Sequence, residues 1–475
     1  MGESDLPGLG PSEPEPWRRA ALWAGPLAAA AVFWALVARG SSREVAWTAA
    51  ATVWCGVWWV LEPVPLAATS LIPFAVLPLG GVLSHKQVAT AYGHHLVLLM
   101  LAGSMVSMAM ERTGAHRHIA LGIVRAVGGR GPRRLVLGFL LASAGLSMWM
   151  SNTATAVMLL PVALATIAAG DEDALAAPVL LAVAYGASIG GSVTPIGTPP
   201  NLIFAGHYEA ATGGTTMAFS EWMALGVPIA ALLLPLTAWW LGRGLQAGAP
   251  LRLPDVGRWQ PQQRRVLVVF GLMALAWMTR EGPAGGWARW IDHAGTIGDS
   301  TVAIAAALVL FVLPRGGGEP GRLLDWPTAA RIPWGVFIMI GGGIALGMGF
   351  EASKLSQQLG QALMPLARLS PWLVVPLVCL VATFATEVTS NTAVANVAMP
   401  VLAAAATSAA VDPAWLMLPA VFGLNHAFML PVATAPNAIM YGTGRVSTGR
   451  MAKEGLVLNL LAVAVISVVC LWSLG

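Results

Sequence analysis

The chain has 475 residues, of which 57% are hydrophobic and only 10% are charged, and its formal net charge is +4. Soluble domains carry about 25% charged residues, so this composition excludes an ordinary water-soluble enzyme. The basic residues lie in short segments between apolar runs, which excludes a nucleic-acid-binding protein. We therefore expect an all-α integral membrane protein, because a helix in lipid pairs its backbone polar groups within its own segment.

The start of the chain is rich in acidic, proline and glycine residues, so we expect residues 1–19 to form a disordered cytoplasmic tail. The apolar run that follows lacks a signal-peptide cleavage pattern, which predicts a retained first helix. The remaining residues, 20–475, are expected to form one membrane transporter domain. Its predicted parts are N-terminal scaffold helices (20–93), a first repeat (94–241), a linker with connecting helices (242–332) and a second, inverted repeat (333–475).

Thirteen apolar runs follow one another along the chain, and some are long enough to tilt or break within a bilayer. Two of them, 135–168 and 372–408, carry a polar Ser-Asn-Thr at their centre, which predicts helical hairpins that enter and leave on the same side. The other eleven predict transmembrane helices. They lie near residues 20–38, 45–61, 64–83, 95–111, 176–206, 221–241, 266–280, 299–314, 333–351, 415–445 and 454–473.

The basic residues predict the orientation of these spans. With a cytoplasmic N-terminus, 19 of the 26 lysines and arginines fall in inside loops, in agreement with the positive-inside rule. This arrangement places the first hairpin on the cytoplasmic side, the second hairpin on the external side, and the C-terminus outside. The two halves are then related by inverted topology, as in many secondary transporters. We expect a multi-pass protein of the inner (plasma) membrane.

The two Ser-Asn-Thr tripeptides, Ser151–Thr153 and Ser390–Thr392, have matching surroundings. Their asparagines are 239 positions apart, and each is followed nine residues later by a proline. Farther on, each half contains a proline-bearing segment that predicts a broken helix, Gly197–Asn201 and Ala433–Asn437, and the asparagines of the two segments are 236 positions apart. One such tripeptide usually serves helix–helix packing, but interrupted segments in corresponding positions of two halves point to the binding site of a secondary transporter.

These motifs suit an anion and a small cation together. Ser, Asn and Thr are good helix N-caps, and the helix that each one starts directs N–H groups and a partial positive charge at its ligand. Thr198 followed by Pro199 fits the start of a half-helix, and Thr434 repeats it with Ala435 in place of the proline. The preceding helix ends offer carbonyls that suit sodium. No lysine or arginine lies in the four motifs, so a dianion there should require bound cations.

Other polar residues carry open alternatives. Glu387 and His426 lie in apolar stretches, where ionisable residues are functional candidates. Glu387 serves either coupling or anchoring of the hairpin, and His426 either contacts substrate, carries a proton or is buried and neutral. Ser188 stands in a Gly-x-Ser-x-Gly sequence, but the apolar helical context favours close packing over a nucleophile. His94 and His95 show no metal-ligand spacing.

Several of these stretches resemble the divalent anion/sodium symporter (DASS) family, the bacterial relatives of solute carrier family 13. The resemblance covers nearly all of the chain after residue 45, and the paired Ser-Asn-Thr motifs with their proline breaks are its most specific part. It is carried by Leu61–Pro65, Met108–Ala120, the first Ser-Asn-Thr block, Ile196–Asn201, Trp334–Gly349, Thr386–Thr392 and Ala427–Thr434.

The resemblance implies an eleven-span homodimer in which a transport domain moves against a scaffold as an elevator. It implies one sodium site at Ser147, Ser151, Asn152 and Gly197, and another at Thr386, Thr389, Asn391 and Ala433. It places the substrate carboxylates at Ser151, Asn152, Thr153, Thr198 and Pro199 from one half, and at Ser390, Asn391, Thr392 and Thr434 from the other.

We therefore expect sodium-coupled symport of a C4-dicarboxylate such as succinate, malate or fumarate. Two departures from the family pattern leave alternatives open: Ala435 stands where a second proline is common, and Asn425-His426 where small or apolar residues are common. A histidine beside the second sodium site can carry a positive charge and weaken sodium dependence. A sodium-independent dicarboxylate or citrate exchanger is therefore an alternative. Sulfate is a third possible substrate, and an intramembrane hydrolase using Ser188 is a remote alternative.

Overall fold

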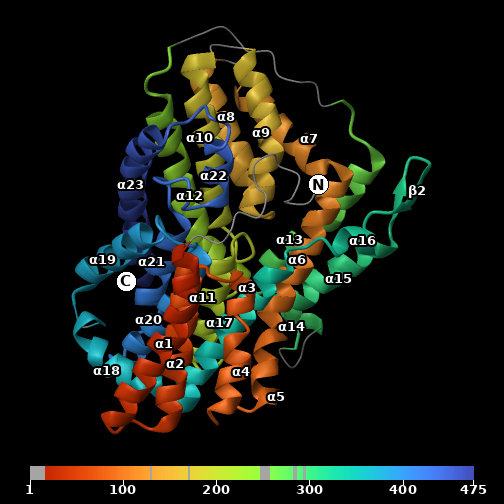
Figure 1. Cartoon of the computed structure of the whole chain (residues 1–475). Helices are drawn as coiled ribbons and strands as arrows, with labels where there is room; N and C mark the ends of the chain where they lie inside the picture. The colour runs from red at the N-terminus through yellow and green to blue at the C-terminus, as the bar shows by residue number, and fades with distance from the viewer. Residues whose placement is uncertain are drawn as a thin grey trace.

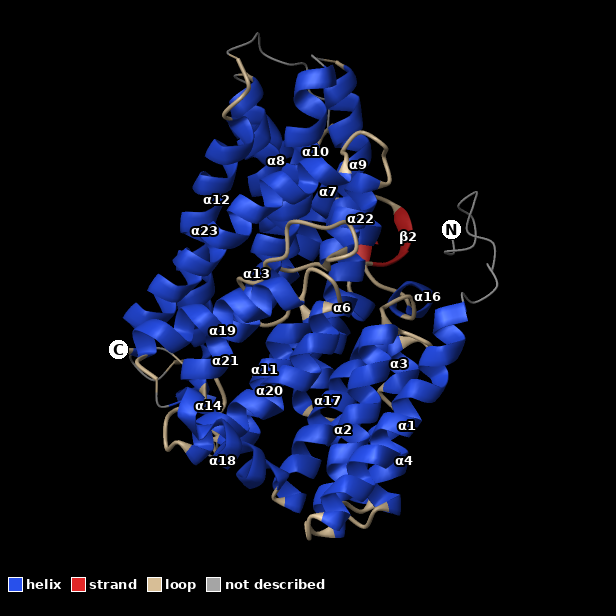
Figure 2. Cartoon of the chain, turned by 60° about the vertical axis from the view of Figure 1, so that its left-hand side comes forward, coloured by secondary structure: helices blue, strands red, loops and turns tan. Residues whose placement is uncertain are grey.

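The computed structural model describes residues 16–128, 131–169, 172–246, 257–281, 286–291, 296–367 and 369–475. Within these ranges the chain is folded almost entirely into helices (Figure 2). One short antiparallel hairpin, β1 (Pro314–Gly316) and β2 (Glu319–Arg322), projects from the side of the molecule (Figure 1). The expected all-α membrane fold is thus confirmed. Most of the predicted disordered tail lies outside the described residues, since α1 begins at Pro16.

The helices divide into those before the first hairpin, the two repeats and the connecting elements. Those up to the end of the first repeat are α1 (Pro16–Ala38), α2 (Arg43–Leu61), α3 (Leu66–Thr69), α4 (Ile72–Leu79), α5 (His85–Tyr92), α6 (His95–Thr113), α7 (Ala115–Gly128), α8 (Pro132–Ser147), α9 (Asn152–Ala168), α10 (Glu172–Gly191), α11 (Pro199–Ala211) and α12 (Phe219–Gly242). The rest are α13 (Pro261–Arg280), α14 (Ala288–Ile291), α15 (Asp299–Val312), α16 (Trp326–Ala329), α17 (Trp334–Ser353), α18 (Leu355–Ala367), α19 (Pro371–Ala385), α20 (Asn391–Ser408), α21 (Ala414–Asn425), α22 (Ala435–Tyr441) and α23 (Thr448–Leu474).

All four predicted helix breaks are present. The two hairpins separate into α8 and α9 before Asn152, and into α19 and α20 before Asn391. The two interrupted segments separate into α10 and α11, and into α21 and α22. Thr198 and Thr434 occupy the N-cap positions of the half-helices α11 and α22. The Thr434 hydroxyl accepts the Asn437 N–H as predicted, whereas the Thr198 side chain makes no capping bond.

The number of spans remains a prediction. Among the described residues, six helices are long and apolar enough to cross a membrane by themselves. Hairpin arms and half-helices such as α9, α19 and α21 are apolar but shorter. Their lengths are expected where a helix stops near the middle of the bilayer, because a full crossing takes about 20 residues.

The two repeats are interleaved. In each repeat the first hairpin arm packs on the first part of the broken helix, α8 on α10 and α19 on α21. Each half-helix then packs on the second hairpin arm of the other repeat, α11 on α20 and α22 on α9. The first hairpin lies in the upper part of the molecule and the second in the lower part, so that the four breaks meet between them (Figure 1).

Close packing explains the glycines of α10. A Cβ on Gly186 would lie 2.6 Å from the Leu140 carbonyl oxygen, and one on Gly190 would lie 2.2 Å from that of Ala144. These two glycines therefore let α10 approach α8 at backbone distance. Ser188 between them is fully buried inside α10, which removes the context that a nucleophile elbow requires.

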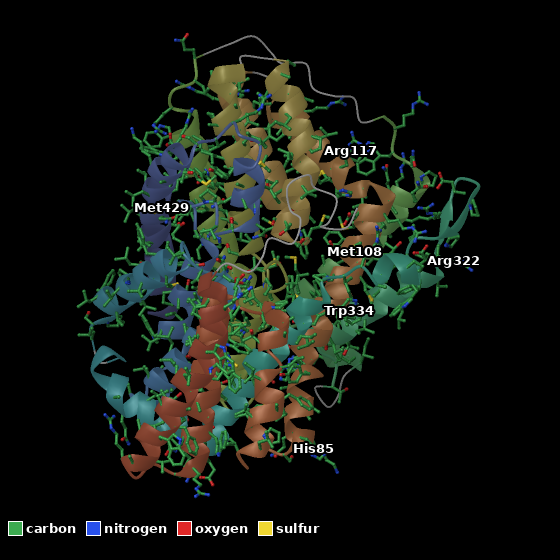
Figure 3. All side chains as sticks on the ribbon, viewed as in Figure 1. His85, Met108, Arg117, Arg322, Trp334 and Met429 are labelled. Atoms are coloured by element: carbon green, nitrogen blue, oxygen red, sulfur yellow. The ribbon has the colours of Figure 1, made fainter. Side chains whose placement is uncertain are left out.

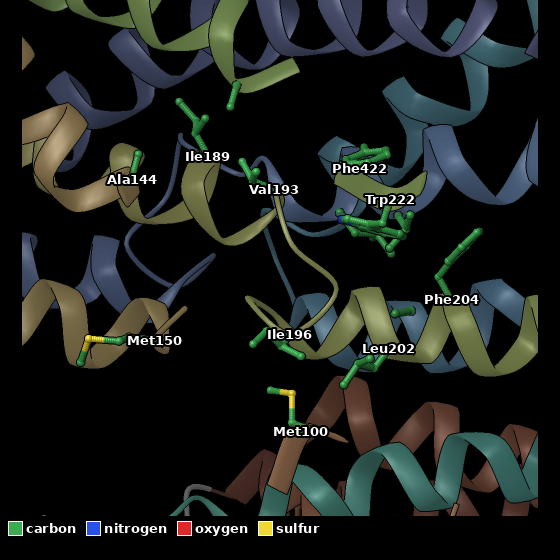
Figure 4. Packing of buried hydrophobic residues seen from close by; sticks show 14 of the residues in the cluster. Met100, Ala144, Met150, Ile189, Val193, Ile196, Leu202, Phe204, Trp222 and Phe422 are labelled. Carbon is green, nitrogen blue, oxygen red and sulfur yellow. The ribbon is translucent and has the colours of Figure 1, made fainter. Parts of the chain in front are cut away.

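Aromatic side chains join the repeats near the breaks. Trp222 from α12 packs between Phe204 of α11 and Phe422 of α21, with ring centroids 5.4 and 5.0 Å away (Figure 4). The indole N–H of Trp222 donates to the Ser192 carbonyl at 3.0 Å. This bond satisfies a backbone acceptor of the unwound stretch between α10 and α11, where no helical partner is available.

Candidate functional site

A cavity of about 930 Å³ lies where the four breaks meet. One wall consists of the hairpin tips and broken segments of both repeats, and the other of α6 and the start of α17. In Figure 3, Met108 of α6, which lines the cavity, and Trp334 at the start of α17 lie at about mid-height of the molecule. The cavity is large enough for a small dicarboxylate with its cations, since sites for small ligands commonly measure about 300–1,000 Å³.

Every residue predicted to bind substrate lines this cavity. These are Ser151, Asn152, Thr153, Thr198, Pro199, Ser390, Asn391, Thr392 and Thr434. Of the residues predicted to bind sodium, Ser151, Asn152, Gly197, Asn391 and Ala433 also line it. Ser147, Thr386 and Thr389 are set behind the tips and do not line the cavity.

Two of these recessed residues hold the tip asparagines in matching ways. The Ser147 hydroxyl donates to the Asn152 side-chain oxygen at 2.6 Å, and the Thr386 hydroxyl donates to that of Asn391. Both bonds span five residues across the hairpin turn. The hydroxyl and amide oxygens at each tip thus lie together as a cluster of neutral oxygen ligands, which suits a hard cation.

Gly191 makes room for the first of these clusters. A Cβ at this position would lie 2.4 Å from the Asn152 side-chain oxygen and 2.7 Å from Thr198 Cγ2. Both distances are far below van der Waals contact. The end of α10 therefore has to be glycine for Asn152 and Thr198 to occupy their places.

The broken segments are held by two asparagines with the same bonding pattern. The Asn201 amide donates to the carbonyls of Gly191 and Thr194, at 3.1 and 2.8 Å. The Asn437 amide donates to the carbonyls of Ala427 and Leu430, at 3.2 and 3.1 Å. The sequence intervals are the same, ten and seven residues, so each asparagine closes its unwound loop in the same geometry.

Asn425 connects the repeats, and sequence reasoning assigned it no role in the site. It accepts a hydrogen bond from the Thr198 hydroxyl at 2.9 Å and donates its amide to the Asn201 side-chain oxygen at 2.7 Å. All three side chains are buried. The end of α21 in the second repeat therefore orients a cavity-lining threonine of the first repeat. The signal for it was its departure from the usual small or apolar residue.

Glu387 lies behind the second hairpin tip and outside the cavity lining. Its carboxylate accepts backbone N–H bonds from Phe428, Met429 and Leu430 at 2.8 to 3.1 Å, and an amide bond from Asn459 at 2.6 Å. These bonds satisfy a buried charge without a cation. Of the two alternatives for Glu387, the contacts favour anchoring of the unwound stretch between α21 and α22.

His426 is fully buried and is not part of the cavity lining. Its Nδ1 lies 2.7 Å from the Phe422 carbonyl oxygen, which only accepts, so Nδ1 carries the proton. Its Nε2 is buried without a hydrogen-bond partner among the described residues. This environment favours the buried, neutral alternative over direct substrate contact.

Arg331 was counted only as a loop residue in the sequence, but it borders the cavity. It is exposed and lies between α16 and α17, while Glu111 near the end of α6 borders the same opening. This position cannot be inferred from the sequence, because Arg331 is far along the chain from both hairpins and both broken helices. The Arg331 guanidinium attracts anions to this opening, and the Glu111 carboxylate opposes that attraction.

Comparisons with known proteins match this architecture. A family model described as "Citrate transporter" matches residues 56–423. The sodium-dependent dicarboxylate transporter SdcS of Staphylococcus saprophyticus is 37% identical over 443 residues, covering 88% of this chain and 84% of that protein. SdcS of Staphylococcus aureus strain bovine RF122 is 36% identical over 449 residues, covering 90% and 85%.

A solved structure shares the fold. It is the YdaH transporter of Alcanivorax borkumensis, whose topology is described as unusual. The TM-score is 0.57 with 14% sequence identity, and the match covers 89% of this chain and 98% of that one. At this identity the likeness concerns the fold alone.

Proposed function

Because the chain belongs to the divalent anion/sodium symporter family, we propose that it imports a C4-dicarboxylate such as succinate, malate or fumarate together with sodium ions. It is a multi-pass membrane transporter and not an enzyme. The observation that carries the proposal is the pair of matched tips: Asn152 and Asn391, each oriented by a hydroxyl from its own hairpin, face one cavity.

The anion is proposed to lie between the two tips. The helices α9, α11, α20 and α22 start at residues that line the cavity, and the first-turn N–H groups of α9 and α20, one helix from each hairpin, are available to two carboxylates. A dicarboxylate has two anionic ends for two such tips, which a single tetrahedral anion such as sulfate does not. The proposed ligands are the nine substrate residues expected from the sequence.

Sodium is proposed to bind beside each tip. The first site comprises Ser147, Ser151, Asn152 and Gly197, and the second Thr386, Thr389, Asn391 and Ala433. The Thr389 hydroxyl is buried and has no hydrogen-bond partner among the described residues. Its oxygen is therefore available to bind a cation. Because the four motifs hold no lysine or arginine, sodium supplies the positive charge that stabilises the dianion.

The transport cycle is proposed to follow an elevator mechanism in a homodimer, with a cytoplasmic N-terminus and an external C-terminus. Glu111 and Arg331, which border the cavity, lie in segments that the charge pattern places in the cytoplasm. The described conformation is then open to the inside. The hairpins and broken helices would move past the wall formed by α6 and α17.

The proposal is tested by uptake of radiolabelled succinate into proteoliposomes under an inward sodium gradient, with potassium as the matched control. Each condition is run with and without succinate inside. Concentrative uptake that requires sodium but no internal succinate supports the symporter. Uptake that ignores sodium and requires internal dicarboxylate would establish an exchanger instead.

A further inference from the structure

A second cavity, of about 340 Å³, lies at the opposite end of α6 from the opening near Arg331. It is bordered by the residue before α6, the end of α11 and the middle of α17, and it does not include any residue of the four motifs. Its lining includes His94, His207, Glu209 and Gly347.

Three side chains that can ligate a metal meet beside this cavity, and two of them, His94 and Glu209, line it. The Nε2 atoms of His94 and His95 lie 3.9 and 3.5 Å from one carboxylate oxygen of Glu209. One ligand atom from each residue lies within 4.8 Å of the others. The adjacent histidines alone have no metal spacing, and Glu209 comes from a helix more than 100 residues later, so the sequence could not reveal the group.

Two buried polar atoms at this site make no hydrogen bond within the described part of the chain. The shared Glu209 oxygen is buried and has no hydrogen-bond partner among the described residues, and the same holds for Nε2 of His207, which borders the cavity. His207 is only 3% exposed. Gly347 of α17 leaves room for its ring, since a Cβ there would lie 2.6 Å from the imidazole. Buried polar atoms are nearly always paired, so an unpaired imidazole nitrogen beside a carboxylate oxygen that two histidines share points to a ligand-binding site.

We propose that His94, His95 and Glu209 bind a zinc ion. Imidazole nitrogens and a carboxylate oxygen are zinc ligands, and three protein ligands with one open position form a common zinc site. A tetrahedral zinc ion with bonds of about 2.0–2.2 Å keeps its ligand atoms roughly 3.3–3.6 Å apart, so small side-chain rotations close the observed arrangement. His207 lines the same cavity but is not in the group whose ligand atoms lie within 4.8 Å of one another, so the fourth position is left open. Ions such as calcium, which prefer all-oxygen sites, fit poorly.

Zinc binding to His94 would remove one weak hydrogen bond of that side chain. His94 Nδ1 accepts a 3.4 Å bond from the Leu96 N–H at the start of α6. A zinc ion on Nε2 places the proton on Nδ1, so this long cap is lost. The His95 side chain is 43% exposed, which gives the ion a route from solvent.

A bound ion would also affect transport. It would tie the start of α6 to the end of α11, two helices that the proposed elevator moves relative to one another. Zinc is therefore expected to inhibit uptake. This consequence rests on the proposed function, whereas zinc binding itself does not.

The test is direct zinc titration of the purified full chain without a polyhistidine tag, read by bound metal per chain and by the melting temperature. Wild-type protein is expected to bind one zinc per chain and to melt at a higher temperature with zinc. His95→Ala and Glu209→Gln should each weaken zinc binding roughly tenfold or more, because even the loss of a group that only supports a zinc ligand typically has an effect of this size. Both side chains are partly exposed, so the folds should survive.

His85→Ala is the matched control, because His85 is an exposed histidine at the far end of α5 (Figure 3). It should bind zinc as wild type does. The site would be overturned if the wild type bound no stoichiometric zinc, or if His95→Ala and Glu209→Gln bound zinc as tightly as the wild type does. Zinc binding to the variants at wild-type strength would mean adventitious surface histidines.

Discussion

The two repeats present the same hairpin tips but support their unwound segments in different ways. In the first repeat the Met148 carbonyl, at the position 239 residues before Glu387, accepts a bond from the Thr194 hydroxyl. In the second repeat Glu387 itself holds three consecutive N–H groups through its carboxylate. The ligand-facing geometry is thus duplicated, whereas the structure behind it is not.

A second difference concerns the two loop-closing asparagines. The side-chain oxygen of Asn201 is paired with Asn425, whereas that of Asn437 is buried without a partner among the described residues. The position 236 residues before Asn425 is Ile189, which cannot donate. The first broken segment is therefore held by an asparagine of the second repeat, whereas the second broken segment receives a different bond from the first repeat, from the Tyr185 hydroxyl of α10 to the Phe428 carbonyl at 2.8 Å.

The largest predicted effect tests the part that the repeats share. Asn152→Ala and Asn391→Ala should each reduce sodium-driven uptake to background, because each side chain serves the anion and a cation together. The measurement is uptake per properly folded protein, with elution from a sizing column as the control for folding. Substantial transport in only one of the two variants would show that the tips are not equivalent.

The next effect tests the difference behind the tips. Glu387→Gln should lower the free energy of unfolding by about 2–3 kcal/mol or more, because it leaves buried N–H groups without their charged acceptor. Met148→Leu is the matched control in the first repeat, where only the backbone carbonyl is used, and should cost less than about 1.5 kcal/mol. Denaturation of both variants measures the comparison, and equal losses would contradict the asymmetry.

A smaller effect is expected at the link between the repeats. Asn425→Leu leaves the Thr198 hydroxyl and the Asn201 oxygen unpaired, so succinate affinity should fall roughly tenfold, or about 1.4 kcal/mol. Ile189→Val, at the equivalent position of the first repeat, is the control and should leave affinity unchanged. Equilibrium binding of succinate in sodium gives both values, and an unaltered affinity in Asn425→Leu would refute the positioning role.

The smallest effect concerns the entrance, where Arg331 belongs to neither predicted repeat. Arg331→Gln should raise the apparent KM for succinate by about two- to threefold and leave the maximal rate unchanged, since an exposed charge steers without binding. The difference from wild type should shrink as ionic strength rises. A fall in the maximal rate would instead place Arg331 in the binding site.

The sequence predicts the duplicated part of the site well because both copies obey local rules. N-capping residues and prolines mark where α9, α11, α20 and α22 begin, and the matched intervals identify the repeats. The nine predicted substrate residues consequently line one cavity. The number of spans is harder to predict, because hairpin arms and half-helices are apolar but too short to be recognised as crossings.

Contacts between distant segments are what the sequence does not reveal. Asn425 meets Thr198 across 227 positions, and Glu387 reaches Asn459 across 72. Neither pair has a periodicity or motif of its own. The position of Arg331 beside the cavity depends likewise on how α17 packs against the hairpins.

The central claim is that sodium provides the positive charge that the anion requires. It is tested most directly by calorimetric titration of succinate into the purified protein in sodium, and then in potassium at the same ionic strength. The account predicts binding in sodium and little or none in potassium, and reciprocally a higher sodium affinity in the presence of succinate. Equal succinate affinity in the two salts would contradict it.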